Sequence, residues 1–268
     1  MLTTDRGIRV LGPADLTDFL VLTARDPVVN VFAEHRARTT NLDPRWLGGE
    51  VWGHYDDSGR LSAACHVVAF ATRALARPRT VSTIVGHHQA VETFWGVVGA
   101  TWGAAREVRW QQPHLVIEGA AQVAGHAEVR RTVRSDFETL YPACVAMYEE
   151  EIGISPEDAG GREMYRARVL QLVTRGWSFA RFDGDEVVFK AEVACVSPSA
   201  AQVQGVWVPP DRRGEGLATS GLAAVVEAVR RDIAPAVSLY VNEWNGPARR
   251  VYDRLGFRET ARFSTIMF

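Results

Sequence analysis

The sequence predicts an α/β protein built around a mixed sheet, and three observations support this class. Both halves of the chain carry the same order of a short strand, a helix and a β-hairpin. Both hairpins turn at Asp-rich segments that contain glycine, which is typical of tight turns between paired strands. A further strand ends near residue 208 in a glycine-bearing turn that enters an amphipathic helix.

Composition limits the class of protein. The 268 residues are 47% hydrophobic and 23% charged with a formal net charge of −2, as in a globular protein of one large or two modest domains. That charge argues against a chain-wide nucleic-acid surface. Cys65, Cys144 and Cys195 lie far apart, so they predict neither a disulfide framework nor a metal site. With no signal-like start and no apolar run of roughly 20 residues, we expect a cytoplasmic protein without a membrane partner.

The first half begins with a short strand at 9–11 and a helix that opens at 15–20. A hairpin follows, running from 51–55 through the turn 56–59 into 60–68. Alternating apolar and polar residues on both sides of the turn favour paired strands.

The second half repeats this order. A strand at 129–133 precedes a helix that opens at Ser135, with Glu138 three residues later in the spacing of a capping box. A hairpin then runs from 177–182 through an Asp-Gly-Asp turn into 186–196.

The recurrence after about 120 residues predicts a tandem duplication. The alternative is that any two α/β segments share such an order. The small residues at 119–125 suit a linker, so we expect domains at 1–122 and 126–268.

The most informative segment is the turn after the strand that contains Val206, Trp207 and Val208. Gly214 and Gly216 allow a ligand to approach the backbone closely. The unpaired amides at the start of the following helix, together with the helix dipole, favour an anion such as a pyrophosphate. A glycine turn before a helix is by itself weak evidence, because many helices begin in this way.

A second pattern follows about 30 residues later. A strand at 237–242 leads into a helix that opens at Asn245-Gly246-Pro247, carries Tyr252 and ends at Gly256-Phe257. Here the sequence resembles the GNAT (Gcn5-related N-acetyltransferase) superfamily. Arg213-x-x-Gly216-x-Ala218 matches its R/Q-x-x-G-x-G/A motif, and Asn245-x-x-Ala248-x-x-x-Tyr252-x-x-x-Gly256-Phe257 matches its C-terminal pattern.

The resemblance covers about residues 126–268. The segments at 82–86, 112–113 and 147–153 are similar to those of an actinobacterial two-domain group whose N-terminal region is called DUF4081. It implies tandem GNAT-like domains, each with a central, mostly antiparallel sheet flanked by helices. The first domain would be degenerate and the second catalytic. The segment 82–89 enters its helix at 90–98 with one glycine and no R/Q-x-x-G-x-G/A motif, so we expect no CoA site in the first half.

The resemblance implies an acetyl-CoA-dependent N-acetyltransferase in which an amine attacks the thioester directly, with no metal. Tyr252 matches the general acid; the alternative is a partly buried packing residue. The positions that match the family's acetyl-CoA contacts are Val206, Trp207, Val208, Arg213, Gly214, Glu215, Gly216, Leu217, Ala218, Thr219, Asn242 and Asn245.

The general base departs from the familiar pattern, because Gln202 and Gln204 stand on the strand where many relatives carry glutamate. We expect Glu150 or Glu151 to face the amine acceptor, although a solvated helix end explains these residues equally well. Glu192 is the next candidate, and an ion pair with Lys190 is its favoured role. The alternative function is a non-catalytic acyl-CoA-binding sensor or scaffold. The acceptor is a small molecule or protein amine, and a monomer or homodimer is expected.

Overall fold

The computed structural model describes residues 8–47, 50–64, 79 and 81–268. Its contacts divide the chain into two compact units, each described separately below. The first comprises Met1–Leu115, Tyr240–Asn245 and Glu259–Phe268, and the second comprises Val116–Leu239 and Gly246–Arg258. Their bounds differ from the halves at 1–122 and 126–268, because the last strand of the chain belongs to the first unit.

One part of the first unit is a three-stranded antiparallel sheet of β1 (Ile8–Val10), β2 (Trp52–Tyr55) and β3 (Leu61–Ala64), in that order. Three helices accompany it: α1 (Leu16–Thr23), α2 (Val31–Thr40) and α3 (Pro44–Leu47). Leu11, Phe19 and Leu61 are buried between the sheet and these helices. The predicted strand, helix and hairpin are therefore present, although residues 65–68 of the hairpin lie outside the described residues.

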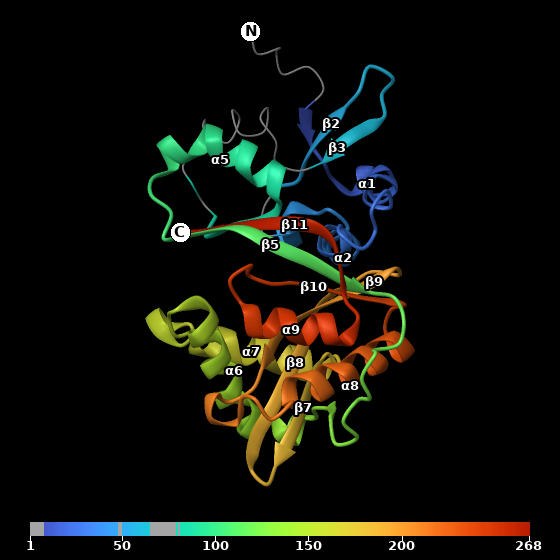
Figure 1. Ribbon diagram of the computed structural model, residues 1–268. Coiled ribbons are helices and arrows are strands. Elements are labelled where there is room, and N and C mark those ends of the chain that lie inside the picture. The colour runs from blue at the N-terminus through green and yellow to red at the C-terminus, as the bar shows by residue number, and fades with distance from the viewer. Residues whose placement is uncertain (1–7, 48–49, 65–78, 80) are drawn as a thin grey trace. The chain divides into compact units, whose positions relative to one another are not determined.

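The other part of the first unit contains β4 (Thr83–His87), α5 (His88–Trp102), β5 (Glu107–Ile117) and β11 (Arg258–Met267). β11 lies between β4 and β5 and is antiparallel to β4 (Figure 1). The helix is longer than the expected 90–98. Phe94 and Val98 lie on its buried face and pack against Ile84 and Trp102.

The second unit has a sheet in the order β10 (Ala236–Tyr240), β9 (Ala200–Trp207), β8 (Glu186–Val196), β7 (Ser178–Asp183) and β6 (Arg130–Arg131). Only the β10–β9 pair is parallel. The predicted second hairpin is confirmed as β7 and β8. The sheet is mixed and mostly antiparallel, as predicted, although β10 ends two residues before the expected 242.

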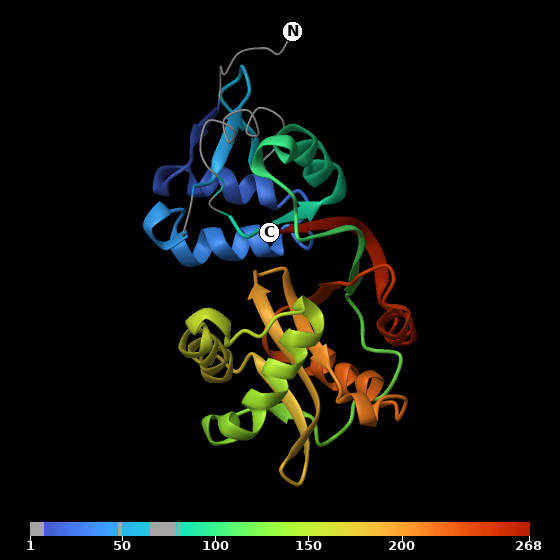
Figure 2. The same ribbon diagram turned by 90° about the vertical axis from the view of Figure 1, so that its left-hand side faces the viewer.

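Helices cover both faces of this sheet (Figure 2). α6 (Phe137–Ile152) and α7 (Arg162–Thr174) bury Leu140 and Val169 with Ala180 of the sheet on one face. α8 (Leu217–Asp232) packs on the other, where Gly221 allows close approach to the Phe189 ring. Adjacent strand residues point to opposite faces, so Lys190 points toward the α6 face. α9 (Gly246–Leu255) completes the unit.

The start of each half is held by the same local device. Arg9 pairs with Asp15, which also accepts from the amide of Gly12. Arg130 pairs with Asp136 at 2.7 Å, and that carboxylate accepts from the amide of Val133 at 2.7 Å. Both ion pairs join residues six apart. This shared geometry supports the predicted duplication.

The structure corrects one local expectation. The Ser135–Glu138 capping box is not formed, because α6 begins at Phe137, after a short 3-10 turn at Arg134–Asp136. The Glu138 carboxylate instead accepts from Arg166 at 2.7 Å. Asp136, between the two residues of the expected box, supplies the side-chain acceptor.

The expected linker at 119–125 is packed against the second unit. Gln122 donates its amide to the carbonyl of Leu255 at 3.1 Å. A Cβ on Gly125 would lie 2.7 Å from the Cα of Ala224, so the chain passes directly over α8 at this point. Cys144 and Cys195 are buried free thiols, and Cys65 lies outside the described residues.

Candidate functional site

The glycine turn begins where β9 ends. After a 3-10 turn at Pro210–Arg212, the chain reaches Gly214 with φ +90° and Gly216 with φ +81°, which is the N-cap of α8. Both values lie in the left-handed region that favours glycine. A Cβ at either position would meet nothing within 4 Å, so space for a ligand is present over the backbone.

The amides of this turn are arranged to receive an anion. Those of Gly214, Glu215 and Gly216 make no backbone hydrogen bond in the described part of the chain. Leu217 and Ala218 occupy the first turn of α8, where amides have no partner within the helix. Thr219 is bonded to the carbonyl of Gly216 at 3.1 Å. The exposed donors and the positive end of the helix dipole therefore coincide.

The side chain of Arg213 is used within the protein. Its Nε donates to the carbonyl of Val208 at 3.1 Å, and its guanidinium donates to Glu150 at 2.6 Å. Glu150 also accepts from the Trp207 indole at 3.1 Å. Arg213 and Glu150 thus connect the end of β9, the glycine turn and the end of α6.

The neighbouring charges of the turn are also paired. Arg212 donates to Glu215 at 3.0 Å and to Asp183 at 3.3 Å. Glu215 therefore closes an ion pair on the outside of the turn, and its carboxylate is held by Arg212.

The three carboxylates at the end of α6 diverge as successive helix positions must. All three residues are exposed, and α6 ends at Gly153, whose amide donates to the carbonyl of Glu149 at 2.8 Å. Hydrogen bonding from Arg213 lowers the pKa of Glu150, against a smaller opposing effect of burial. The charge of Glu151 instead raises the pKa of the Tyr252 hydroxyl.

Tyr252 lies on α9 and is 7% exposed. Its ring packs against Phe257 at 5.8 Å between centroids. Burial raises the pKa of the Tyr252 hydroxyl, and the Glu151 carboxylate raises it further. The phenol therefore keeps its proton at neutral pH and could donate it to a leaving group.

The strand positions expected to carry a base hold amides. Gln202 is buried, and Gln204 donates to Glu192 at 2.8 Å. Lys190 pairs with the same carboxylate at 3.4 Å, so the expected ion pair is present. The Lys190 ammonium also donates to the carbonyl of Gly205 at 3.2 Å, a contact that no pattern in the sequence indicates.

The two asparagines of the predicted set belong to the first unit. Asn242 is 4% exposed and accepts from the Gln112 amide at 2.9 Å, and Gln112 accepts from Thr265 at 2.6 Å. Asn245 donates its amide to the carbonyl of Asn242 at 2.9 Å. The other predicted site residues all lie in the second unit.

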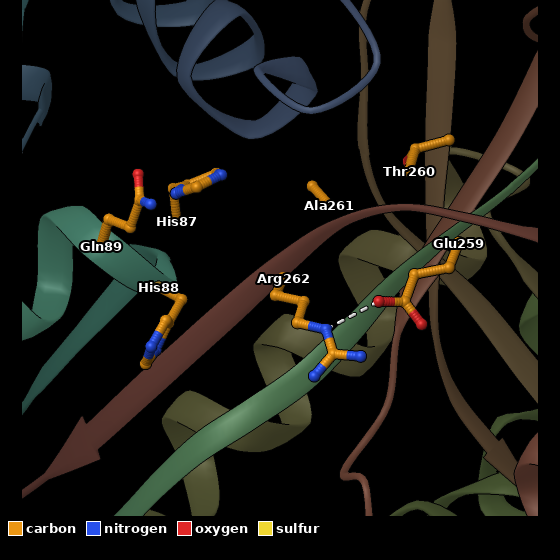
Figure 3. A pocket seen from close by; sticks show the side chains of 7 residues that line it. All are labelled: His87, His88, Gln89, Glu259, Thr260, Ala261 and Arg262. Atoms are coloured by element: carbon orange, nitrogen blue, oxygen red, sulfur yellow. Dashed lines mark hydrogen bonds and ion pairs between the residues drawn. The ribbon is translucent and has the colours of Figure 1, made fainter.

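The first unit has a hollow of its own at the start of α5, with a volume of about 440 Å³ (Figure 3). His87, His88 and Gln89 line it from β4 and α5, and residues 259–262 line it from β11. Arg262 pairs with Glu259 there at 2.8 Å. The hollow lies at the segment for which the sequence predicts no CoA site, and that prediction stays untested.

Two further findings concern metal ligands and membrane-spanning helices. Among the residues that the structure describes, no group of three or more His, Cys, Asp or Glu side chains could hold a metal ion. No helix within the same residues is long and apolar enough to cross a membrane.

This arrangement of sheet, glycine turn and helices is the N-acetyltransferase fold, as solved structures show. A GCN5-related N-acetyltransferase from Sphaerobacter thermophilus is 18% identical with a TM-score of 0.59, covering 99% of this chain and 96% of that one. A Drosophila protein is 14% identical with a TM-score of 0.64, covering 97% and 98%. A GNAT acetyltransferase from Colwellia psychrerythraea is 13% identical with a TM-score of 0.56, covering 97% and 99%.

Family models define the two parts of the chain more closely. Residues 162–257 match the acetyltransferase (GNAT) family, so this part of the chain is similar to that family. Residues 49–140 match DUF4081, a domain of unknown function. Both expected resemblances are confirmed.

One relative is similar over a shorter stretch. The mycothiol acetyltransferase of Brachybacterium faecium is 34% identical over 76 residues, which are 28% of this chain and 23% of that protein. The match thus spans about a quarter of that relative's length.

Proposed function

We propose that the protein is an acetyl-CoA-dependent N-acetyltransferase that transfers an acetyl group to a primary amine. The observation that carries this proposal is the open glycine turn at 213–216, with unpaired amides at 214–216 and free space above both glycines, within the segment that matches the GNAT family. A pyrophosphate needs such a cradle of backbone donors at a helix start.

The donor side uses backbone more than side chains. The amides of residues 214–219 receive the pyrophosphate, and β9 with Val208 supplies amides for the pantetheine arm and the thioester carbonyl. Arg213 stabilises the turn and does not contact the ligand itself, because its guanidinium already binds the carbonyl of Val208 and the carboxylate of Glu150. Asn242 and Asn245 are the remaining proposed cofactor contacts.

The reaction is a direct displacement. The neutral amine nitrogen forms a bond to the thioester carbonyl carbon, and the carbon–sulfur bond breaks. Tyr252 gives its proton to the departing thiolate, and the nitrogen loses a proton to a carboxylate or to water. The raised pKa of Tyr252 keeps the phenol protonated until the thiolate forms.

Glu151 is the better candidate for the acceptor side of this site. Glu150 already accepts hydrogen bonds from Arg213 and Trp207. These bonds lower its pKa and make it a weaker base. Glu151 is exposed and close enough to Tyr252 to affect its pKa. A carboxylate there attracts a cationic amine and accepts its proton.

The alternative is an acyl-CoA-binding sensor or scaffold without turnover. One observation favours it: the strand carries Gln202 and Gln204, whose amides cannot accept a proton at neutral pH. Binding would then be retained and transfer would be absent.

Two measurements separate these functions. Titration calorimetry with acetyl-CoA should show one site per chain. Release of CoA, followed with a thiol reagent, should then depend on one class in a panel of amino acids, polyamines, aminoglycosides and protein amines. Binding without release for any amine supports the sensor, and absence of binding refutes both functions.

A further inference from the structure

The only lysine of the chain is buried beneath the strand that carries the proposed donor site. Lys190 lies on β8 and is fully buried on the α6 face of the sheet. Apart from the histidines, every other basic side chain of the sequence belongs to an arginine. Burial lowers the pKa of Lys190, and Cys144 and Glu192 raise it, with a net rise that keeps the ammonium charged.

Its contacts converge on one peptide group of β9. The Lys190 ammonium donates to the carbonyl of Gly205 at 3.2 Å and to Glu192 at 3.4 Å. Gln204 donates to the other oxygen of Glu192 at 2.8 Å and covers the pair at its solvent side. A Cβ on Gly205 would lie 3.1 Å from the Lys190 Nζ, so the backbone at Gly205 is in close contact with the ammonium.

This peptide lies at a β-bulge. Lys190 pairs with Trp207 and Glu192 with Gln204, so β9 has one residue more than β8 between these pairs. Gly205 has φ +59°, the left-handed conformation that such a bulge requires. The ammonium therefore binds the carbonyl at the point where β9 leaves regular pairing and continues toward Val208.

We propose that Lys190 is a positioning residue that orients and polarises the Gly205–Val206 peptide, so that the Val206 amide donates to the thioester carbonyl of bound acetyl-CoA. This inference rests on the proposed function. A trans peptide is planar, and its N–H points opposite to its C=O. Because Lys190 binds the carbonyl, the Val206 amide points away from the buried pair.

The ammonium also strengthens that donor. A charge-assisted hydrogen bond to the carbonyl draws electron density from the amide nitrogen, and linked hydrogen bonds reinforce one another. Donors fixed before the reaction stabilise the oxyanion that forms during acyl transfer. Stability alone gives little reason for the pair, because well-packed apolar residues often replace buried ion pairs without loss. Glu192 and Gln204 supply the compensating charge and the cover that the buried ammonium needs.

The test uses vibrational spectroscopy of acetyl-CoA labelled with ¹³C at the thioester carbonyl. We expect the carbonyl stretch of the bound label to shift to lower frequency in the wild-type protein. The double variant Lys190→Met/Glu192→Gln removes both charges at little change in volume, and it should lose most of this shift. The affinity of the double variant for CoA, which lacks the thioester carbonyl, should change by less than about threefold.

Two controls make the result specific. Ser238→Ala is a buried substitution elsewhere in the sheet and should keep the shift. In the wild-type protein the amide proton of Val206 should move downfield with acetyl-CoA and much less with CoA, which requires no variant. A retained shift in the double variant, or an equal response of Val206 to both ligands, overturns the role of Lys190. Failure of the wild-type protein to bind acetyl-CoA overturns the proposed function as well.

Discussion

Substitution of Gly216 tests the pyrophosphate site most directly. Gly216 has φ +81°, where a side chain costs roughly 1–2 kcal/mol. A Cβ there meets no protein atom within 4 Å, so no clash adds to this cost. Gly216→Ala should therefore lower the free energy of unfolding by about 1 kcal/mol, and Gly59→Ala, at φ +75° in the β2–β3 turn of the first unit, should do the same.

The charge in Gly216→Asp adds an effect on binding alone. A carboxylate about 5 Å from one phosphate charge is repelled by roughly 1–3 kcal/mol for effective dielectric constants between 80 and 20. This corresponds to about a 5- to 150-fold loss of acetyl-CoA affinity relative to Gly216→Ala. The introduced carboxylate also accepts hydrogen bonds from the amides at the start of α8, and it therefore competes with the pyrophosphate for these donors.

The assay pairs titration calorimetry with urea unfolding for the three variants. Gly59→Ala should keep wild-type affinity despite its loss of stability, whereas both Gly216 variants should bind more weakly, the Asp variant most. The assignment of the turn is refuted if folded Gly216→Asp binds acetyl-CoA as tightly as Gly216→Ala does.

Four further substitutions test the remaining groups. Tyr252→Phe should lower kcat about 100-fold with little change in acetyl-CoA affinity; an equal loss in binding would identify a packing residue. Glu151→Gln should depress kcat/KM and shift the acidic limb of its pH profile, whereas Glu150→Gln should mainly weaken acetyl-CoA binding; equal, small effects would identify a solvated helix end. Burial lowers the pKa of His114 to about 4 from 6.5, so the folded state should lose about 3 kcal/mol as pH falls from 6.5 to 4. His114→Gln should remove this dependence in urea unfolding, and an unchanged pH profile would contradict it.

Local signals in the sequence determined much of the fold and part of the candidate site. The hairpin of β7 and β8 follows from a short Asp-Gly-Asp turn between alternating strands, and the hydrogen bonds around Asp136 repeat those around Asp15. The glycine turn before α8 is likewise a local signal, because left-handed backbone and a helix start need particular residues within a few positions. Such features depend on residues that are close together along the chain, and these can be read from a single sequence.

Only the tertiary structure decided how these pieces combine. Arg213 and Glu150 are 63 residues apart, and nothing in either segment indicates that they pair. Placement of β11 against β4, and therefore of residues 259–268 in the first unit, is equally invisible in local patterns. The bulge at Gly205 depends on the register between β8 and β9, and the burial of Lys190 depends on α6 covering that register. Such contacts arise from packing between distant segments, where burial and shape override local preference.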